Sequence, residues 1–173
     1  MPAVVDERAG SMPGASDIFL AVQTRRAGKI KGEAVSPGHE DEIVVQGWNW
    51  GVSASATAGG TQTTARRVYK GLTVVKAIDS ATTALMSALA SNDEVKEARL
   101  TMRKPGSEQI GFFFVTLKSA RVASLEHATD AQGNTLETVT FLFAKVEVEY
   151  RPQTAAGGRG ASFSFSDDIT PAS

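Results

Sequence analysis

Apolar and polar residues alternate along much of the chain. This period of two is typical of β-strands, because successive side chains of a strand point to opposite faces of a sheet. The strand-like segments follow one another at hairpin-like spacing, and together they predict a mainly β fold, an antiparallel barrel or sandwich. The predicted strands are 17–24, 43–55, 66–78, 94–104, 109–118, 120–129 and 137–151, with a short one at 163–165.

One segment, 79–91 (DSATTALMSALAS), has the period of a helix instead. Its apolar residues recur at three- and four-residue spacing, which places them on one narrow stripe. Asp79 or Ser80 can accept a hydrogen bond from a free backbone N–H at the start of the segment. The pattern therefore predicts one helix beside the strands. The residues of the stripe are Ile78, Ala81, Leu85, Ala88 and Leu89.

The segment 31–51 (KGEAVSPGHEDEIVVQGWNWG) places both tryptophans of the chain shortly after a long polar loop. Residues 32–42 contain a proline and two glycines and show almost no periodicity. Loops of about a dozen residues without secondary structure are usually functional in a compact domain. We therefore expect this loop to face a partner.

In the strand that follows the loop, the period of two separates large side chains from small ones. Trp48 and Trp50 share one face, whereas Gly47, Asn49 and Ser53 lie on the other. Tryptophans on the inward face of a strand are more often core residues than a binding platform. We therefore expect the two indoles in the core and the small residues outside it.

Two strands are more apolar than a free-standing domain requires. Residues 112–115 are four consecutive apolar residues, and residues 141–144 are apolar on both faces. The apolar positions of the last strand also change from odd to even numbers near Phe143. A β-bulge near that residue explains the change, and so does packing of an outer wall against another copy of the protein. The candidates for a lateral interface, or for the core beneath it, are Phe112, Phe113, Phe114, Phe141 and Phe143.

The composition excludes several classes of protein. The chain has 173 residues, no cysteine, and 18 Lys+Arg against 19 Asp+Glu, for a net charge of −1. Disulfides, thiolate zinc sites and a cysteine nucleophile are therefore excluded, and no net positive charge attracts nucleic acid. No apolar run reaches the length of about 20 residues that a membrane span requires. The first residues lack a basic start followed by an apolar stretch, so we expect no N-terminal signal peptide.

The sequence contains no common catalytic or nucleotide-binding motif. His39 and His127 are far apart in the sequence, and the acidic residues 40–42 would not converge on one ion in an extended chain. We predict no catalytic, cofactor-binding or metal-ligating residue and no enzymatic activity. We expect the protein neither to bind nucleic acid nor to insert into a membrane. Two rival interpretations stay open: an OB-like barrel that binds single-stranded nucleic acid, and an enzyme with a dispersed active site.

Six short motifs follow one another along the chain. They are KGE at 31–33, GHEDEI at 38–43, WNWG at 48–51, ARLTMRK at 98–104, FFFVTLK at 112–118 and FAKVEVEYRPQ at 143–153. In this order they resemble the Hcp family, the tube protein of bacterial type VI secretion. The resemblance covers about residues 17–153, and it departs from the family pattern at Asn49, where a small hydroxyl residue is familiar.

The resemblance implies an antiparallel two-sheet β-barrel with one flanking α-helix and a long extended loop over residues 17–153. Residues 1–16 are expected to form a disordered lead-in, and residues 154–173 a flexible tail. Proteins of this family form hexameric rings that stack into a hollow tube, which a contractile sheath drives out of the cell behind a spike. The tube carries effector proteins, in some members as their chaperone.

Partners and location follow from the same resemblance. The expected partners are other copies of the chain, the sheath and spike proteins, and effector proteins in the lumen. The expected location is the bacterial cytoplasm before firing, and afterwards the extracellular space or a target cell. A phage tail-tube subunit, which shares the barrel-and-ring plan, is the alternative.

The resemblance also gives roles to residues. Trp48 and Trp50 are expected to fill the barrel core. Gly47, Asn49 and Ser53 then face the channel and its cargo. The polar loop is expected to reach a neighbouring subunit or ring, and its residues are Lys31, Gly32, Glu33, His39, Glu40, Asp41 and Glu42.

Overall fold

The computed structural model describes residues 17–55, 66–104, 110–153 and 161–169. Within them the chain is mainly β with one helix, which confirms the predicted fold class. The predicted lead-in, 1–16, and much of the predicted tail, 154–173, lie outside the described residues. The elements are β1 (Asp17–Thr24), β2 (Gly28–Ile30), β3 (Ile43–Val44), β4 (Gly47–Ser55), β5 (Arg66–Ala77), α1 (Thr82–Ala90), β6 (Val95–Arg103), β7 (Gly111–Thr129), β8 (Thr135–Tyr150) and β9 (Phe163–Asp168).

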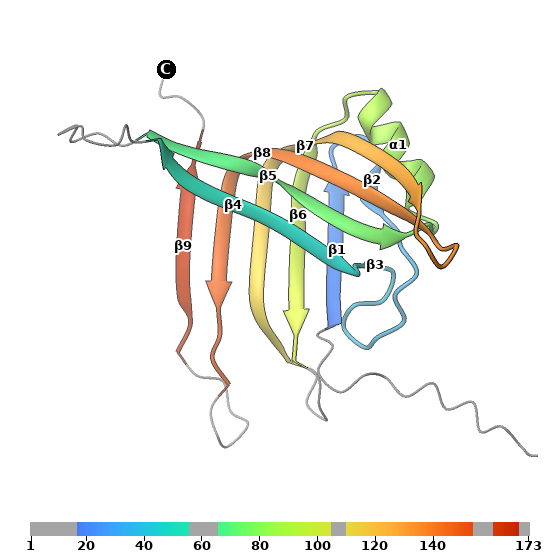
Figure 1. The fold of residues 1–173 in the computed structure, drawn as a ribbon. Coiled ribbons are helices and arrows are strands. Elements are labelled where there is room, and N and C mark those ends of the chain that lie inside the picture. Colours follow the sequence, from blue (N-terminus) through green and yellow to red (C-terminus); the bar gives the residue numbers. More distant parts are fainter. Residues whose placement is uncertain (1–16, 56–65, 105–109, 154–160, 170–173) are drawn as a thin grey trace, which may run out of the picture.

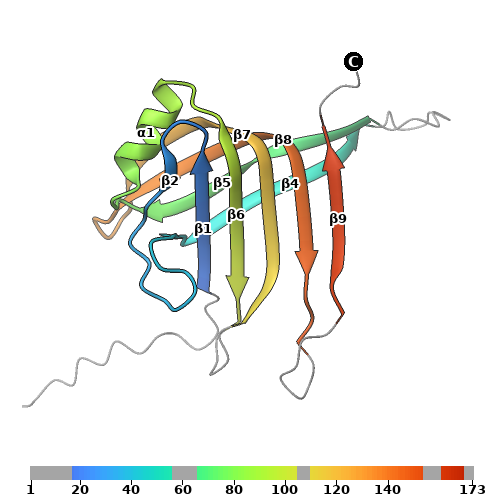
Figure 2. The same ribbon diagram turned by 180° about the vertical axis from the view of Figure 1, so that it is seen from behind.

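The strands form one antiparallel sheet that is folded into two layers. The strand order is β2-β1-β6-β7-β8-β5-β4, with β3 paired to β1 and β9 paired to β8. Figure 1 shows β1, β6 and β9 in one layer, with parts of β7 and β8 between β6 and β9, while β4 and β5 cross over them in the other layer. The helix α1 lies at one end of the two layers, and Figure 2 shows the same arrangement from behind.

The long strands β7 and β8 belong to both layers. Residues 136–141 of β8 pair with β5, whereas residues 145–150 pair with β9. The β7–β8 register shifts between Val122 and Ser124, so the bulge lies on β7 rather than near Phe143 of β8. The buried face of β8 changes where the strand passes from one layer to the other, because Phe141 and Val146 are both fully buried.

The predicted strand 43–55 is divided into β3 and β4, because its two halves have different partners. β3 pairs with β1 in one layer, and β4 pairs with β5 in the other. Between them the N–H of Val45 donates to Ile18 O at 3.0 Å, and the N–H of Gln46 donates to Val75 O at 2.8 Å. This segment therefore bridges the two layers at the side where β1 and β5 approach each other.

The core lies between the two layers and continues beneath α1. Ala81, Leu85 and Ala88 are buried against it, as the helical spacing predicts. Ile78 and Leu89 are 50% and 37% exposed, because the helix begins only at Thr82 and its buried face is narrower than the predicted stripe. The Asp79 carboxylate accepts a bond from the N–H of Ala81 at 2.9 Å, although Ala81 and not Asp79 is the N-cap residue.

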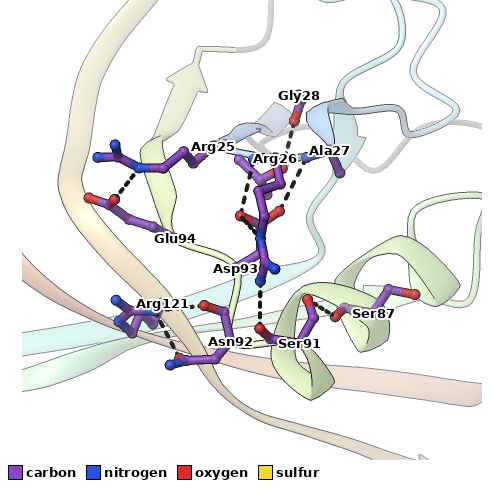
Figure 3. Close-up of polar contacts among 11 residues, drawn as sticks. Arg25, Arg26, Ala27, Gly28, Ser87, Ser91, Asn92, Asp93, Glu94 and Arg121 are labelled. Atoms are coloured by element: carbon purple, nitrogen blue, oxygen red, sulfur yellow. Dashed lines mark hydrogen bonds and ion pairs between the residues drawn. The ribbon is translucent and has the colours of Figure 1, made fainter.

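A polar cluster connects the β1–β2 turn to the end of α1 (Figure 3). The Asp93 carboxylate accepts bonds from the N–H of Arg26 at 3.1 Å and from the N–H of Ala27 at 3.2 Å. Burial raises the pKa of Asp93, but these backbone bonds outweigh it and hold the pKa below its usual value. Arg121 of β7 donates to the backbone and side-chain oxygens of Asn92, both at 2.8 Å. The cluster therefore fixes the helix end against both β1 and β7.

Candidate interaction surfaces

The polar loop 31–42 folds back on itself. The N–H of Gly32 donates to Asp41 O at 2.8 Å, the N–H of Ala34 donates to Glu42 O at 3.0 Å, and the N–H of Asp41 donates to Ala34 O at 3.0 Å. The reversal uses positive φ angles at Gly38 (83°) and Asp41 (61°). The loop therefore has a defined shape, which the lack of periodicity in its sequence did not predict.

One contact attaches the loop to β1, one braces the loop internally and one connects it to the segment before α1. The His39 ring stacks on the ring of Phe19, with centroids 4.5 Å apart and planes 8° apart. The His39 Nδ1 lies 2.7 Å from a Glu42 carboxylate oxygen. The Ser80 hydroxyl donates to Lys31 O at 3.0 Å. The tip of the loop stays outside, where Val35 is 88% exposed.

The predicted loop residues therefore fall into three groups. Lys31, Glu33, Glu40 and Asp41 are exposed, and Gly32 is buried. His39 and Glu42 are half-buried and face each other. The exposed apolar residue at the tip, Val35, was not among the predicted residues, although its place two residues before Pro37 in a polar loop could have drawn attention to it.

Gly47, Asn49 and Ser53 lie on one face of the β4–β5 layer. Because directly paired residues of a sheet share a face, their neighbours on β5 are Val75, Thr73 and Val68. Thr73 is paired in turn with Thr140 of β8, and their hydroxyl oxygens are 3.0 Å apart. These residues are uncharged, but Lys70, which is paired with Gly51, places a positive charge on the same face between Asn49 and Ser53.

Trp48 and Trp50 are half-buried against the core between the layers. The Trp48 ring stacks on Phe113 of β7 at 6.2 Å. The Trp50 ring stacks on Tyr69 of β5 at 6.0 Å and meets Phe143 of β8 edge-on. The indoles thus join aromatic side chains from three other strands.

The five phenylalanines predicted for a lateral interface or core have different environments. Phe141 is fully buried in the core, and Phe113 and Phe143 are partly buried beside the tryptophans. Phe114 is 7% exposed, because the guanidinium groups of Arg99 and Arg151 lie over its ring at 4.8 and 4.6 Å. Phe112 lies beneath Lys104. The larger exposed apolar residues of the sheet are elsewhere: Val44, Val52, Val68, Leu142, Tyr150, Phe163 and Phe165.

An aspartate of β9 connects this strand to the opposite layer. The Asp167 carboxylate accepts bonds from the Arg67 guanidinium and from the Tyr69 hydroxyl, the latter at 2.7 Å. These two donors hold the pKa of Asp167 below its usual value. Burial, reinforced by the bond to Asp167, raises the pKa of Tyr69. No pattern in the sequence indicated this contact, because it depends on β9 lying beside β8.

Replacing Asp167 by asparagine is expected to loosen β9, because the amide cannot pair with the Arg67 charge. Backbone amides of β9 should then exchange with deuterium faster at neutral pH, as measured by mass spectrometry. Since the pKa of Asp167 is lowered, the contact is complete above the ordinary value of 3.8 and is lost as the pH falls through the lower value in the fold. Ser164→Ala, an exposed change in the same strand, is the control and should leave the exchange unchanged.

The His, Asp and Glu residues in the described part of the chain form no cluster of three or more that could hold a metal ion. His127 lies 3.2 Å from Glu137, whose carboxylate also bonds Lys76 and Thr82 in the interior. This group is a structural network beneath α1. No helix among the described residues is long and apolar enough to cross a membrane.

Comparison with known proteins gives consistent matches. Residues 19–150 match the family described as "Type VI secretion system effector, Hcp". "Protein hcp1" of Pseudomonas aeruginosa is 35% identical over 149 residues, which cover 84% of this chain and 89% of that protein. The "Major exported protein" of the same organism is 27% identical over 124 residues, 66% of this chain and 72% of that one. The crystal structure of Hcp1 from Salmonella typhimurium matches with a TM-score of 0.70 and 26% identity, over 90% of this chain and 95% of that one.

Proposed function

The chain belongs to the Hcp family of type VI secretion proteins, and we propose that it is the structural subunit of a secretion tube. Six copies form a ring, rings stack into a hollow tube, and a contractile sheath expels the tube behind its spike. Effector proteins travel in the lumen. The protein acts as a part of this assembly and as an exported product rather than as an enzyme.

The unpaired edge of β4 is the structural observation that supports assembly. β4 is nine residues long and pairs only with β5, so its second edge is free among the described residues. Val52 of this strand is 51% exposed. Soluble proteins normally cover or shorten such an edge, because it offers free backbone groups to another strand. A neighbouring copy that contacts this edge through a different surface makes a head-to-tail contact, and such contacts close into rings when the rotation per copy fits.

The face that carries Gly47, Asn49 and Ser53 supplies the channel wall. Asn49 and Ser53 of β4, Thr73 of β5 and Thr140 of β8 give it small, uncharged side chains, and Lys70 opposite Gly51 adds a positive charge. The Thr73 and Thr140 hydroxyls bond to each other. A wall of this kind offers little to bind a passing protein tightly, so cargo can be held by many weak contacts.

The loop 31–42 connects one ring to the next. Its hydrogen bonds and its contact with Phe19 fix its shape, while Val35 at its tip is free to enter an apolar site on the next ring. A preformed loop loses little conformational entropy on binding, which favours ring stacking.

The size of the purified protein tests the proposed function. We expect light scattering to give a particle of six times 18.2 kDa, and negative-stain images to show rings with an open centre. A particle that stays a single chain at high concentration and low salt, with no rings on the grid, would overturn it.

Asn49→Trp is expected to reduce cargo retention without breaking the rings. Asn49 is exposed on the proposed wall, and an indole there narrows the lumen in six places at once. Co-purification of an effector with tagged rings measures the effect, and Ser53→Ala on the same face is the control. Unchanged cargo recovery with Asn49→Trp would contradict the wall assignment.

A further inference from the structure

β5 changes its partners along its length. Residues 66–75 pair with β4 on one edge, but β8 pairs with the other edge only from Leu72 to Ala77. Beyond Phe141, β8 turns away and pairs with β9 instead. Figure 1 shows the β4–β5 pair continuing past this bend towards the end of β9. Among the described residues, the second edge of β5 from Arg66 to Gly71 therefore has no strand beside it.

Gly71 makes this fork possible. A Cβ atom at this position would lie 2.9 Å from Thr140 Cγ2 and 3.0 Å from Phe141 O. The two strands thus approach closely at the point where they separate, and a larger residue would push them apart. The unpaired edge is a consequence of tight packing at its end rather than of a loose strand.

The edge lines a groove of about 780 Å³. Its other side is made by Leu142 and Phe143 at the bend of β8 and by Ile169 after β9, whose N–H donates to Ala144 O at 2.7 Å. Leu142 is 56% exposed and Val68 is 49% exposed. The groove is therefore apolar along its middle. One of its walls is the unpaired edge of β5, which presents backbone N–H and C=O groups.

Most of the charged residues that line the groove are positive: Arg66, Arg67 and Lys70, against Asp168. The Asp168 carboxylate is paired with Lys145 at 3.6 Å. Arg66, Val68 and Lys70 point to one face of β5, because they alternate along the strand. Arg67, on the opposite face, is neutralised by Asp167. Arg66 and Lys70 are exposed, and neither has an acidic partner within the described part of the chain. Their cationic groups flank Val68 two residues away on each side.

We propose that this edge of β5, residues 66–71, binds an extended acidic segment of another protein by strand addition. The segment adds a strand to the free edge and places an acidic, an apolar and an acidic side chain at alternate positions. These face Lys70, Val68 and Arg66, because cross-strand neighbours lie about 5 Å apart. The apolar side chain also covers Leu142. Only the source of the segment, a carried effector, rests on the proposed function.

The face involved supports that source. Val68 is paired with Ser53 of β4, so the two residues lie on the same face of the layer. That face is the proposed channel wall. Val68, which lines the groove, therefore borders the space in which cargo travels. Arg66 and Lys70 on the same face supply charged contacts that Gly47, Asn49 and Ser53 lack.

A capped peptide tests the proposal on the full-length protein. The probe is acetyl-Thr-Glu-Thr-Leu-Thr-Glu-Thr-amide with a fluorophore, measured by anisotropy, and we expect binding that weakens as salt is added. Two further peptides carry N-methyl groups on one or the other set of alternate amides. Since only one set faces β5 in a strand pair, one of these peptides should lose binding and the other should keep it. Equal binding by both would overturn strand addition.

Two variants that each replace a lysine by glutamate, and so change the net charge equally, locate the site. Lys70→Glu should weaken peptide binding about fivefold, because an exposed ion pair is replaced by a repulsion. Lys96→Glu, on the exposed surface of β6, should leave it unchanged. Equal effects of the two variants would mean that only net charge matters and would overturn the assignment to the groove.

The same measurements separate this proposal from the proposed function. A protein that binds the peptide but forms no rings would refute the tube role and leave the groove in place. Rings that do not bind the peptide, and whose amides 66–71 are protected from deuterium exchange, would show that a second copy pairs with this edge. That result would refute the binding of an acidic segment and leave the tube role in place.

Discussion

Replacing Glu137 by leucine is expected to lower the free energy of unfolding by about 3 kcal/mol, because it leaves a buried ammonium group without its main partner. Glu137 and Lys76 are both 0% exposed and form an ion pair beneath α1. Thr82 donates to the same carboxylate at 3.0 Å. Asp79 still forms an ion pair with Lys76 at 2.8 Å, so the loss should stay at the lower end of the range for broken buried pairs. Urea denaturation at pH 7 measures it.

The matched control removes both charges. The double variant Lys76→Met, Glu137→Leu should recover most of the lost stability, since a well-packed apolar pair often equals a buried ion pair. A single variant that costs less than about 1 kcal/mol, or a double variant that is worse than the single one, would contradict this account of the network.

Acid should act on the same network. Burial raises the pKa of Glu137, but the hydrogen bonds from Lys76 and His127 outweigh it and hold the pKa below the ordinary value of 4.5. A lowered pKa gives stability that is complete above 4.5 and is lost as the pH falls through the lower value in the fold. The wild-type protein should lose stability over this acidic range, and Glu137→Leu should lack that part of the dependence.

Gly32→Ala is expected to open the polar loop and to prevent the rings from stacking. A Cβ atom at this position would lie 2.8 Å from Ile43 Cα and closer still to Glu42 O, and both are backbone atoms that cannot rotate away. The loop must then give up hydrogen bonds such as the one from Gly32 to Asp41, at a cost of about 2 kcal/mol in the free energy of unfolding. Denaturation and negative-stain images of the tubes measure the two effects.

Gly47→Ala is the control for this change. No atom lies within 4 Å of the position that its Cβ would occupy, and its φ angle is not positive. Its stability should change by no more than about 0.5 kcal/mol, and its rings should stack. Normal stacking by the Gly32→Ala protein would show that the folded loop is not needed between rings.

The sequence predicted most strands and the helix, because each depends on local periodicity. It also contained an unused signal for the buried ion pair. Lys76 continues the alternation of Leu72 and Val74, and Glu137 continues that of Val139 and Phe141, so both charges fall on inward faces. That the two charges meet depends on the β5–β8 register, in which Lys76 is opposite Glu137. No local pattern encodes a pairing between residues so far apart.

The candidate surfaces were less predictable for the same reason. The closed form of the loop depends on backbone bonds between its two arms and on the contact between His39 and Phe19. The free edge of β5 depends on where β8 turns away, which is set by tertiary packing at Gly71. The roles of Gly47, Asn49 and Ser53 in a channel stay predictions, because they concern copies of the chain that surround this one.

The continuity of β7 and β8 has a mechanical consequence. Each strand passes unbroken from one layer into the other, and the two stay paired with each other along nearly their whole length. Tension applied to one layer of the subunit is therefore carried to the other by covalent backbone and by the long ladder of β7–β8 backbone hydrogen bonds, which is loaded in shear. Two separate sheets would be held together only by side-chain packing. A tube built from such subunits can be accelerated from its base without its walls peeling apart.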